Sequence, residues 1–156
     1  MRVFVLLFFI SFGCFSQTIT GKVVGIMDGD TFKLLTKDST VIRVRLANID
    51  CPEKKQDFSA KATEFTSKAI FGKTVAVHVQ SKDRYKRYIA NVIYNDSLSL
   101  CHELVKNGLA WHYIKFSKDK TLKQMEDAAR QAKVGLWKDP NPMAPWEWRD
   151  SRRKKK

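Results

Sequence analysis

The chain has 156 residues, which is enough for one domain with a hydrophobic core and too few for two. Its 29 Lys and Arg residues against 16 Asp and Glu residues give a formal net charge of +13. A surface this basic favours polyanionic partners, because neutralising phosphates releases condensed counterions. The three Cys and three His residues have no zinc-ligand spacing, which argues against a soft-metal site.

The first sixteen residues have the pattern of an export signal. The basic Arg2 is followed by residues 3–15, which carry no charge, are rich in Phe, Leu and Ile, and are too short a run to span a membrane comfortably. We expect cleavage after Ser16, a secreted or periplasmic protein, and no transmembrane segment in the mature chain. A buried N-terminal strand or helix and a lipoprotein anchored at Cys14 remain alternatives. Cleavage would remove one positive charge and leave +12.

Alternating apolar residues and turn signals predict five strands. They are residues 23–26, 31–35, 41–49, 75–79 and 88–94. An Asp-Gly pair joins the first two, which indicates a hairpin. In the third, Ile42, Val44 and Leu46 share one face. Arg43 and Arg45 therefore share the opposite face.

Helical spacing of apolar residues predicts three helices, at residues 58–69, 99–107 and 122–132, each followed by a glycine. Residues 139–148, with three Pro and two Trp, predict an extended strap, and the basic tail 150–156 predicts disorder. The element order is typical of an α+β fold with a mainly β core. We expect an OB-fold five-stranded barrel with three helices in residues 17–149, after the signal peptide 1–16.

Two acidic segments lie at the ends of predicted strands. Asp28 and Asp30 belong to the first hairpin turn, and Asp50 and Glu53 follow the third strand. In an antiparallel meander these segments can meet at one end of the barrel. Carboxylates with a nearby backbone carbonyl are hard oxygen ligands that suit Ca²⁺. Glu53 can then activate a metal-associated water.

Two arginines can complete such a site. Arg45 lies on the outer face of the third strand, and Arg87 lies in the turn before the fifth. Guanidinium forks can hold phosphate oxygens and offset charge on a five-coordinate phosphorus. Each motif alone also fits a structural role, as a turn, a strand end or a solvated strand face.

Taken in order, the motifs resemble those of the staphylococcal nuclease family over nearly the whole chain after residue 16. They are Asp-Gly-Asp-Thr ending a valine-rich strand at 23–31, Arg-Leu-x-x-Ile-Asp-x-Pro-Glu at 45–53, the basic and aromatic turn 83–87, and Leu-Val-x-x-Gly-Leu-Ala at 104–110. The resemblance implies a calcium-dependent nuclease that hydrolyses DNA and RNA, cleaving the 5′ P–O bond and leaving 3′-phosphate products. One departure is that residues 54–58 form a shorter loop than the long basic one of the family.

The resemblance also implies roles for individual residues. They are Asp30, Asp50 and the Cys51 backbone carbonyl as calcium ligands, Asp28 as an acid supporting that site, Glu53 as general base, Arg45 and Arg87 on the scissile phosphate, and Tyr85 and Tyr113 along the nucleotide pocket. We expect a monomer with no stable protein partner.

Two alternatives stay open at this point. The first is a non-catalytic OB module that binds nucleic acid or another polyanion, although binding alone has no need of the acidic residues. The second concerns Cys51 and Cys101, which form a disulfide if the protein folds in an oxidising compartment, or else are two buried, unpaired thiols.

Overall fold

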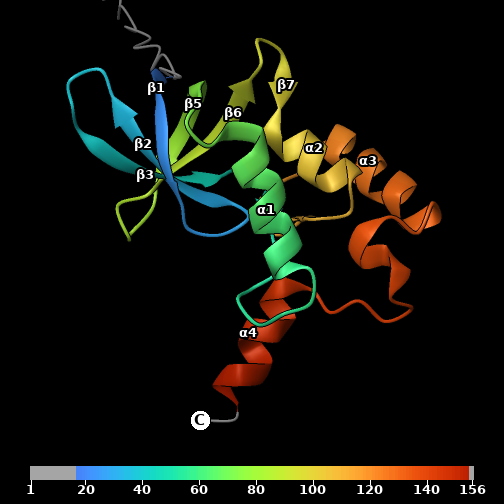
Figure 1. Ribbon diagram of the computed structural model, residues 1–156. Coiled ribbons are helices and arrows are strands. Elements are labelled where there is room, and N and C mark those ends of the chain that lie inside the picture. Colours follow the sequence, from blue (N-terminus) through green and yellow to red (C-terminus); the bar gives the residue numbers. More distant parts are fainter. Residues whose placement is uncertain (1–16, 155–156) are drawn as a thin grey trace, which may run out of the picture.

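A closed barrel of five strands forms the centre of the computed structural model, which describes residues 17–154 (Figure 1). The barrel strands are β1 (Gln17–Ile26), β2 (Thr31–Thr36), β3 (Val41–Leu46), β5 (Thr74–Lys82) and β6 (Tyr88–Tyr94). The sheet order is β3-β2-β1-β5-β6-β7, with β7 (Leu98–Ser99) at its edge. A parallel pairing of β3 with β6 closes the barrel. The α+β class and the five-stranded OB-type barrel are therefore confirmed.

A separate pair of short strands lies beside the barrel and carries one of the acidic segments. It consists of β4 (Ile49–Asp50) and β8 (Trp111–His112), which pair antiparallel with Asp50 opposite Trp111. The sequence predicted a single strand over residues 41–49. It is interrupted because Asn48 has a left-handed backbone, with φ of 66°. That bend lets β4 leave the barrel and pair with β8.

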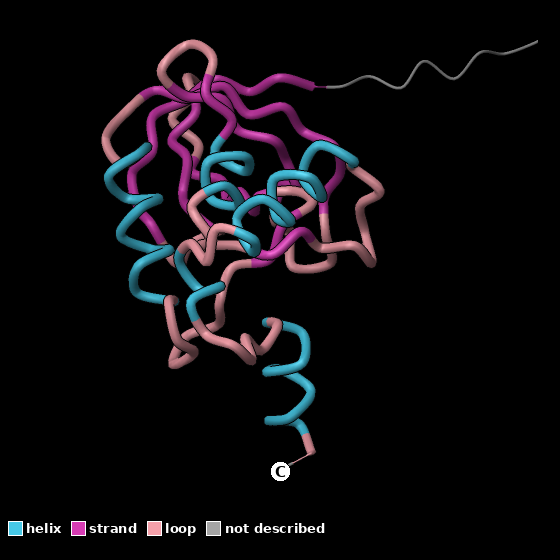
Figure 2. Tube along the Cα trace, turned by 90° about the vertical axis from the view of Figure 1, so that its right-hand side faces the viewer, coloured by secondary structure: helices cyan, strands magenta, loops and turns pink. Residues whose placement is uncertain are grey.

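Alternation along the strands builds the core as expected. Phe32, Leu34, Val44, Val77 and Val92 have essentially no exposed surface. Three of the helices are α1 (Ser59–Ile70), α2 (Leu100–Lys106) and α3 (Lys120–Gln131), and a short 3₁₀ turn η1 (Gly135–Lys138) follows them. Figure 2 shows these helices against the barrel, whereas the C-terminal helix extends away from the body.

That C-terminal helix, α4 (Pro145–Arg153), corrects the expectation of an extended strap, and it also extends into the segment 150–156 that was expected to be disordered. Pro145 occupies the first helical turn, where a missing N–H costs nothing. The Glu147 carboxylate accepts a hydrogen bond from the Ala144 N–H at 3.3 Å. Residues 17–154 therefore contain four α-helices where three were predicted.

The expected export signal, residues 1–16 with Cys14, lies outside the described residues. From residue 17 to 154, none of the helices is long and apolar enough to cross a membrane.

Cys51 and Cys101 are buried and free, so the disulfide is wrong and the alternative of two unpaired thiols is confirmed. Burial raises the pKa of the Cys101 thiol to about 12, and it raises that of Cys51 well above its ordinary value. Few thiolates therefore exist near neutral pH to start oxidation.

We predict that both thiols resist Ellman's reagent until the protein unfolds. In protein that starts at residue 17 and is purified without reductant, the folded state at pH 8 should react slowly, because burial and the raised pKa values keep the thiolate fraction small. After unfolding in guanidinium chloride, two thiols per chain should react. Finding no reactive thiol in the unfolded protein would mean that the cysteines are bonded after all.

Candidate active site

The first acidic turn is held in place by a close contact with α1. A Cβ on Gly29 would come within 2.8 Å of the Ala62 Cβ, so only glycine fits there. The buried Thr66 hydroxyl donates a hydrogen bond to the Gly29 carbonyl at 2.6 Å. The Asp30 N–H donates to Asp28 Oδ1 at 3.1 Å. The turn therefore presents Asp30 from a fixed backbone.

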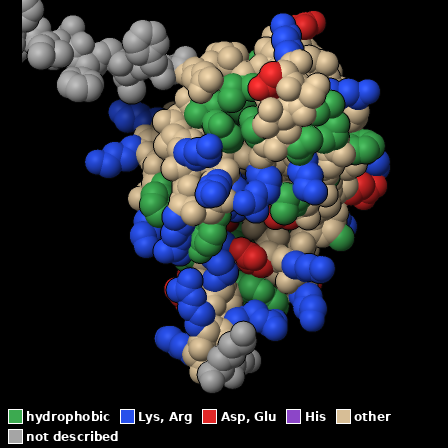
Figure 3. All heavy atoms as spheres, turned by 90° about the vertical axis from the view of Figure 1, so that its left-hand side faces the viewer, with side chains coloured by type: hydrophobic (Ala, Val, Ile, Leu, Met, Phe, Trp, Pro, Cys, Tyr) green, Lys and Arg blue, Asp and Glu red, His purple; other side chains and the backbone are tan. Residues whose placement is uncertain are grey.

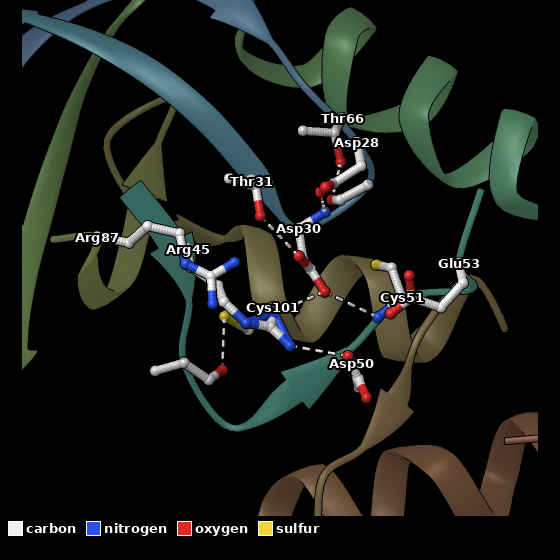
Figure 4. A network of polar contacts seen from close by, with 12 residues as sticks. Asp28, Asp30, Thr31, Arg45, Asp50, Cys51, Glu53, Thr66, Arg87 and Cys101 are labelled. Atoms are coloured by element: carbon white, nitrogen blue, oxygen red, sulfur yellow. Dashed lines mark hydrogen bonds and ion pairs between the residues drawn. The ribbon is translucent and has the colours of Figure 1, made fainter. Parts of the chain in front are cut away.

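The Asp30 carboxylate joins the two acidic segments. Its Oδ2 accepts a hydrogen bond from the Cys51 N–H at 3.0 Å, and its Oδ1 accepts one from the Thr31 hydroxyl at 3.0 Å. Asp30 is 6% exposed and Asp50 is 1% exposed. The expectation that the hairpin turn and the end of the third strand meet at one end of the barrel is therefore met, as Figure 4 shows.

Arg45 lies between the two aspartates (Figure 4). Its Nη1 is 2.9 Å from Asp30 Oδ2, and its Nη2 is 2.8 Å from Asp50 Oδ1. The β2–β3 register fixes this position by pairing Arg45 with Thr31. Burial disfavours the charged guanidinium, but the carboxylates of Asp30 and Asp50 outweigh it and raise the pKa of Arg45.

The Nη1 of Arg45 is buried, and within residues 17–154 it lacks an aligned hydrogen bond despite its short distance to Asp30. Buried donors in folded proteins normally have such a partner. Because Nη1 is not aligned with Asp30, it has a donor that a ligand could use. Arg45 therefore combines a fixed position with unused hydrogen-bonding capacity.

A third arginine, which the sequence reasoning missed, contacts the other side of the cluster. Arg149 of α4 places Nη2 at 2.8 Å from Asp50 Oδ2 and Nη1 at 2.5 Å from Glu53 Oε1. The charges of Asp50 and Glu53 raise the pKa of Arg149, against the effect of its burial. Proline at the first helical turn with glutamate two positions later was the signal for this helix. No local sequence pattern predicts that Arg149 contacts Glu53 and Asp50, which lie 96 and 99 positions earlier in the chain.

Burial raises the pKa of Asp50, even though Arg149 and Arg45 pull it down. Burial and the nearby charge of Asp30 raise the pKa of Asp28 to about 6. Burial is the main cause of both shifts, and the negative charge of Asp30 adds to each of them.

Arg87 and Tyr85 form a second group on the turn between β5 and β6. The Arg87 Nε donates to Asp83 Oδ2 at 2.8 Å, and its guanidinium carbon is 5.6 Å from the centre of the exposed Tyr85 ring. The β3–β6 register pairs Val44 with Tyr88, so Arg87 enters beside β3. Figure 4 shows its side chain extending toward that of Arg45.

Tyr113 packs on the C-terminal helix. Its ring stacks on Trp146 with 5.1 Å between centroids and 1° between planes, and Phe116 meets its edge at 4.8 Å. The structure therefore brings together Asp28, Asp30, Arg45, Asp50, Cys51 and Glu53. Tyr85 and Tyr113 lie on different loops and pack against different partners.

The donor chemistry here fits a hard divalent cation, since Asp30 and Asp50 offer carboxylate oxygens on either side of one guanidinium, with Asp28 nearby. Among residues 17–154, no three acidic, Cys or His groups already converge on one point. Both oxygens of Asp50 face arginines. A cation bound by Asp50 would therefore have to share it with Arg45 or Arg149.

An OB-type barrel with buried carboxylates and arginines at one end defines a class of proteins that act on phosphate-bearing polymers. The chain belongs to the staphylococcal nuclease family. The family model described as staphylococcal nuclease homologue matches residues 43–139.

Sequence similarity to other proteins extends this result. An uncharacterized endonuclease of Escherichia coli O157:H7 is 39% identical over 143 residues, covering 92% of this chain and 93% of that protein. An uncharacterized endonuclease of Haemophilus influenzae is 40% identical over 144 residues, covering 92% and 80%. A micrococcal nuclease of Shigella flexneri is 37% identical over 140 residues, covering 83% and 79%. The chain is accordingly a hydrolase of the nuclease type, with nucleic acid as its substrate.

We predict that Thr66→Val lowers the free energy of unfolding by about 1–3 kcal/mol, because the buried Gly29 carbonyl loses its hydrogen-bond donor. Urea denaturation measures the change. Thr63→Val is the matched control, since the Thr63 hydroxyl bonds only to Ser59 within its own helix and should change stability by less than about 0.5 kcal/mol. Equal losses in the two variants would show that the contact to the acidic turn contributes nothing special.

Proposed function

We propose that the protein is an exported, monomeric, calcium-dependent nuclease that hydrolyses DNA and RNA at the 5′ P–O bond and leaves 3′-phosphate products. The observation that carries the proposal is the Arg45 guanidinium held between Asp30 and Asp50, with Glu53 three residues further along the chain. Export is inferred from the composition of residues 1–16.

A calcium ion held by Asp30, Asp50 and the Cys51 carbonyl would supply Lewis-acid polarisation of the phosphate and charge compensation. Asp28 would support this ion from beside Asp30, to which it is hydrogen bonded. The residues fit the role because their oxygens are hard ligands, and because Asp28, Asp30 and Asp50 lie together here with only Arg45 and Arg149 against them.

The arginines would bind the scissile phosphate. The Nη1 of Arg45 is not aligned with Asp30 and can bond to a phosphate oxygen instead. The contact of Nη2 with Asp50 would hold the guanidinium in place meanwhile. Arg87 can approach from β6, with Asp83 orienting its Nε. Two forks facing the phosphate would stabilise the negative charge that grows as the fifth oxygen adds to phosphorus.

Glu53 would accept the proton of the attacking water. Its Oε1 is bonded to Arg149, so Oε2 is the oxygen at which this proton would be received. Tyr85 is exposed beside Arg87 and can stack on a nucleotide base. Tyr113 would line the other side of the nucleotide site only at its free edges, because Trp146 covers one ring face.

Basic residues would hold the polymer around this site. Figure 3 shows Lys and Arg side chains spread over much of one face, with a few acidic side chains among them. A surface of this kind attracts a phosphate backbone without reading its sequence. A non-catalytic OB module would need only this surface, whereas the buried carboxylates favour an enzyme.

We predict that Glu53→Gln lowers kcat by roughly 10²- to 10⁴-fold, the range of a lost general base. Binding of a non-hydrolysable oligonucleotide should change little, because glutamine keeps the size and hydrogen bonding of the side chain. Glu64→Gln is the matched control, as it makes the same change at an exposed carboxylate of α1 that pairs with Lys68. Absence of Ca²⁺-dependent cleavage by the unmodified protein would favour the binding module instead.

We predict different consequences for the residues that surround the phosphate and the cation. Asp30→Ala should raise the Ca²⁺ concentration needed for half-maximal activity, because a ligand is lost. Arg45→Lys should cleave poorly at saturating Ca²⁺, since an ammonium cannot span two acceptors as the fork does. Calcium titrations of plasmid cleavage distinguish the two effects. A normal calcium requirement in Asp30→Ala would remove that residue from the ligand set.

We predict that deleting residues 152–156 weakens nucleic-acid binding and flattens its dependence on salt, because five Lys and Arg residues are lost. Turnover at saturating substrate should stay close to that of the full chain, since the deletion leaves Arg149 in place. Fluorescence anisotropy at several salt concentrations measures the slope. A large fall in saturated turnover would mean that the end of α4 also shapes the site.

A further inference from the structure

The C-terminal helix contributes a side chain to the catalytic cluster. We propose that Arg149 is a positioning residue that fixes the carboxylate of Glu53 for proton transfer, a role that rests on the function proposed above. Arg149 joins Glu53, which follows β4, to Asp50, which is buried at the barrel end. It therefore acts on the reaction through Glu53 and not by touching the phosphate.

The contacts of Arg149 are unequal in a way that suits this role. The Asp50 side chain is 2% exposed and is held on its other oxygen by Arg45, so it is a rigid anchor. The Glu53 side chain is 37% exposed and lies on the loop before α1. In the part of the chain that the structure describes, Arg149 is the one side chain that hydrogen bonds to the Glu53 carboxylate. Without Arg149, Glu53 would be free to rotate toward solvent.

The helix that carries Arg149 is itself anchored to the barrel. Trp146 stacks on Tyr113 and meets the edge of Trp111 with 5.6 Å between centroids. Trp111 is paired with Asp50 across β4 and β8. Trp111, which contacts the helix, and Asp50, which holds the Arg149 guanidinium, therefore belong to the same small sheet.

A second link ties the backbone of Glu53 to the segment that leads into α4. The Gln56 Oε1 accepts a hydrogen bond from the Glu53 N–H at 2.9 Å, and its Nε2 donates to the Met143 carbonyl at 2.6 Å. Both the main chain and the side chain of Glu53 are therefore oriented by the C-terminal region.

Arginine is the residue type that this geometry requires. The Arg149 Nη1 donates to Glu53 and, at 3.4 Å, to Asp50 Oδ1, while Nη2 donates to Asp50 Oδ2. The two carboxylates are therefore held at the spacing of a rigid fork. Only Oε1 of Glu53 is engaged, and Oε2 stays available for the proton. A lysine at this position could bond to either carboxylate but could not fix one relative to the other.

The experiment is a double-mutant cycle between Arg149→Gln and Glu53→Gln in the full mature chain, read as kcat and KM on an oligonucleotide substrate. Arg149→Gln alone should lower kcat by about 10- to 100-fold with little change in KM, since misplacing a catalytic group costs rate. In the Glu53→Gln background, Arg149→Gln should cost little more, because the group that it positions no longer takes the proton. Arg149→Lys should recover only part of the loss.

The controls separate positioning from loss of charge or of structure. Lys123→Gln removes one positive charge from the exposed face of α3, where Lys123 pairs with Asp127, and it should leave kcat unchanged. Thermal unfolding and binding of a non-hydrolysable oligonucleotide report on folding. If Arg149→Gln does not fold, Arg149→Lys keeps the charge and is used for the same cycle.

Two results would overturn the proposal. Losses that multiply in the double variant would show that Arg149 acts independently of Glu53, and a rise in kcat for Arg149→Gln would show that it obstructs the site. Both can occur while Glu53→Gln remains severely impaired, which leaves the proposed function intact. A normal rate for Glu53→Gln would instead refute the base assignment, and the role of Arg149 with it.

Discussion

The buried ion pair of Arg45 with Asp30 and Asp50 is the interaction on which the rest of this site depends. A guanidinium removed from water is costly unless its charge is matched and its donors are used. Two carboxylates from separate strand ends supply the match, with contacts of 2.9 and 2.8 Å. The β1–β2 turn, β3 and β4 must all reach one end of the barrel for these contacts to form. The site therefore assembles only when the barrel folds.

The same pairing leaves a charge imbalance that has functional meaning. Carboxylates outnumber the guanidinium groups that touch them here, and the pKa of Asp28 is raised to about 6 by burial and by its neighbour Asp30. Replacing a whole buried ion pair by packed apolar residues is often neutral or stabilising, so stability alone does not require Arg45 with Asp30 and Asp50. Retaining this negative charge in a strongly basic chain is consistent with a cation that offsets it, and a basic surface beyond it that attracts phosphate.

The sequence predicts the parts of the molecule that local patterns encode. Alternation at Ile42, Val44 and Leu46 revealed the core face of β3, and the spacing of the acidic motifs identified Asp30 and Asp50. Helix α4 lacks an apolar stripe, and in the sequence only Pro145 and Glu147 indicate its start. It is held in place by Trp146, which packs on Tyr113 and Trp111. The break in the strand at Asn48 depends likewise on pairing with β8.

Asp50 contacts both Arg45 and Arg149 and so connects the interactions of the site. One of its oxygens holds Arg45, which would face the phosphate, and the other holds Arg149, which orients Glu53. Removing its carboxylate would leave two guanidinium groups without their shared partner, and an unpaired buried charge typically costs about 3–5 kcal/mol. A substitution at Asp50 would therefore change cation binding, phosphate binding and the base together. For that reason, the proposed cation site is better tested at Asp30, whose carboxylate does not contact Arg149 and is separately held by Thr31 and the Cys51 N–H.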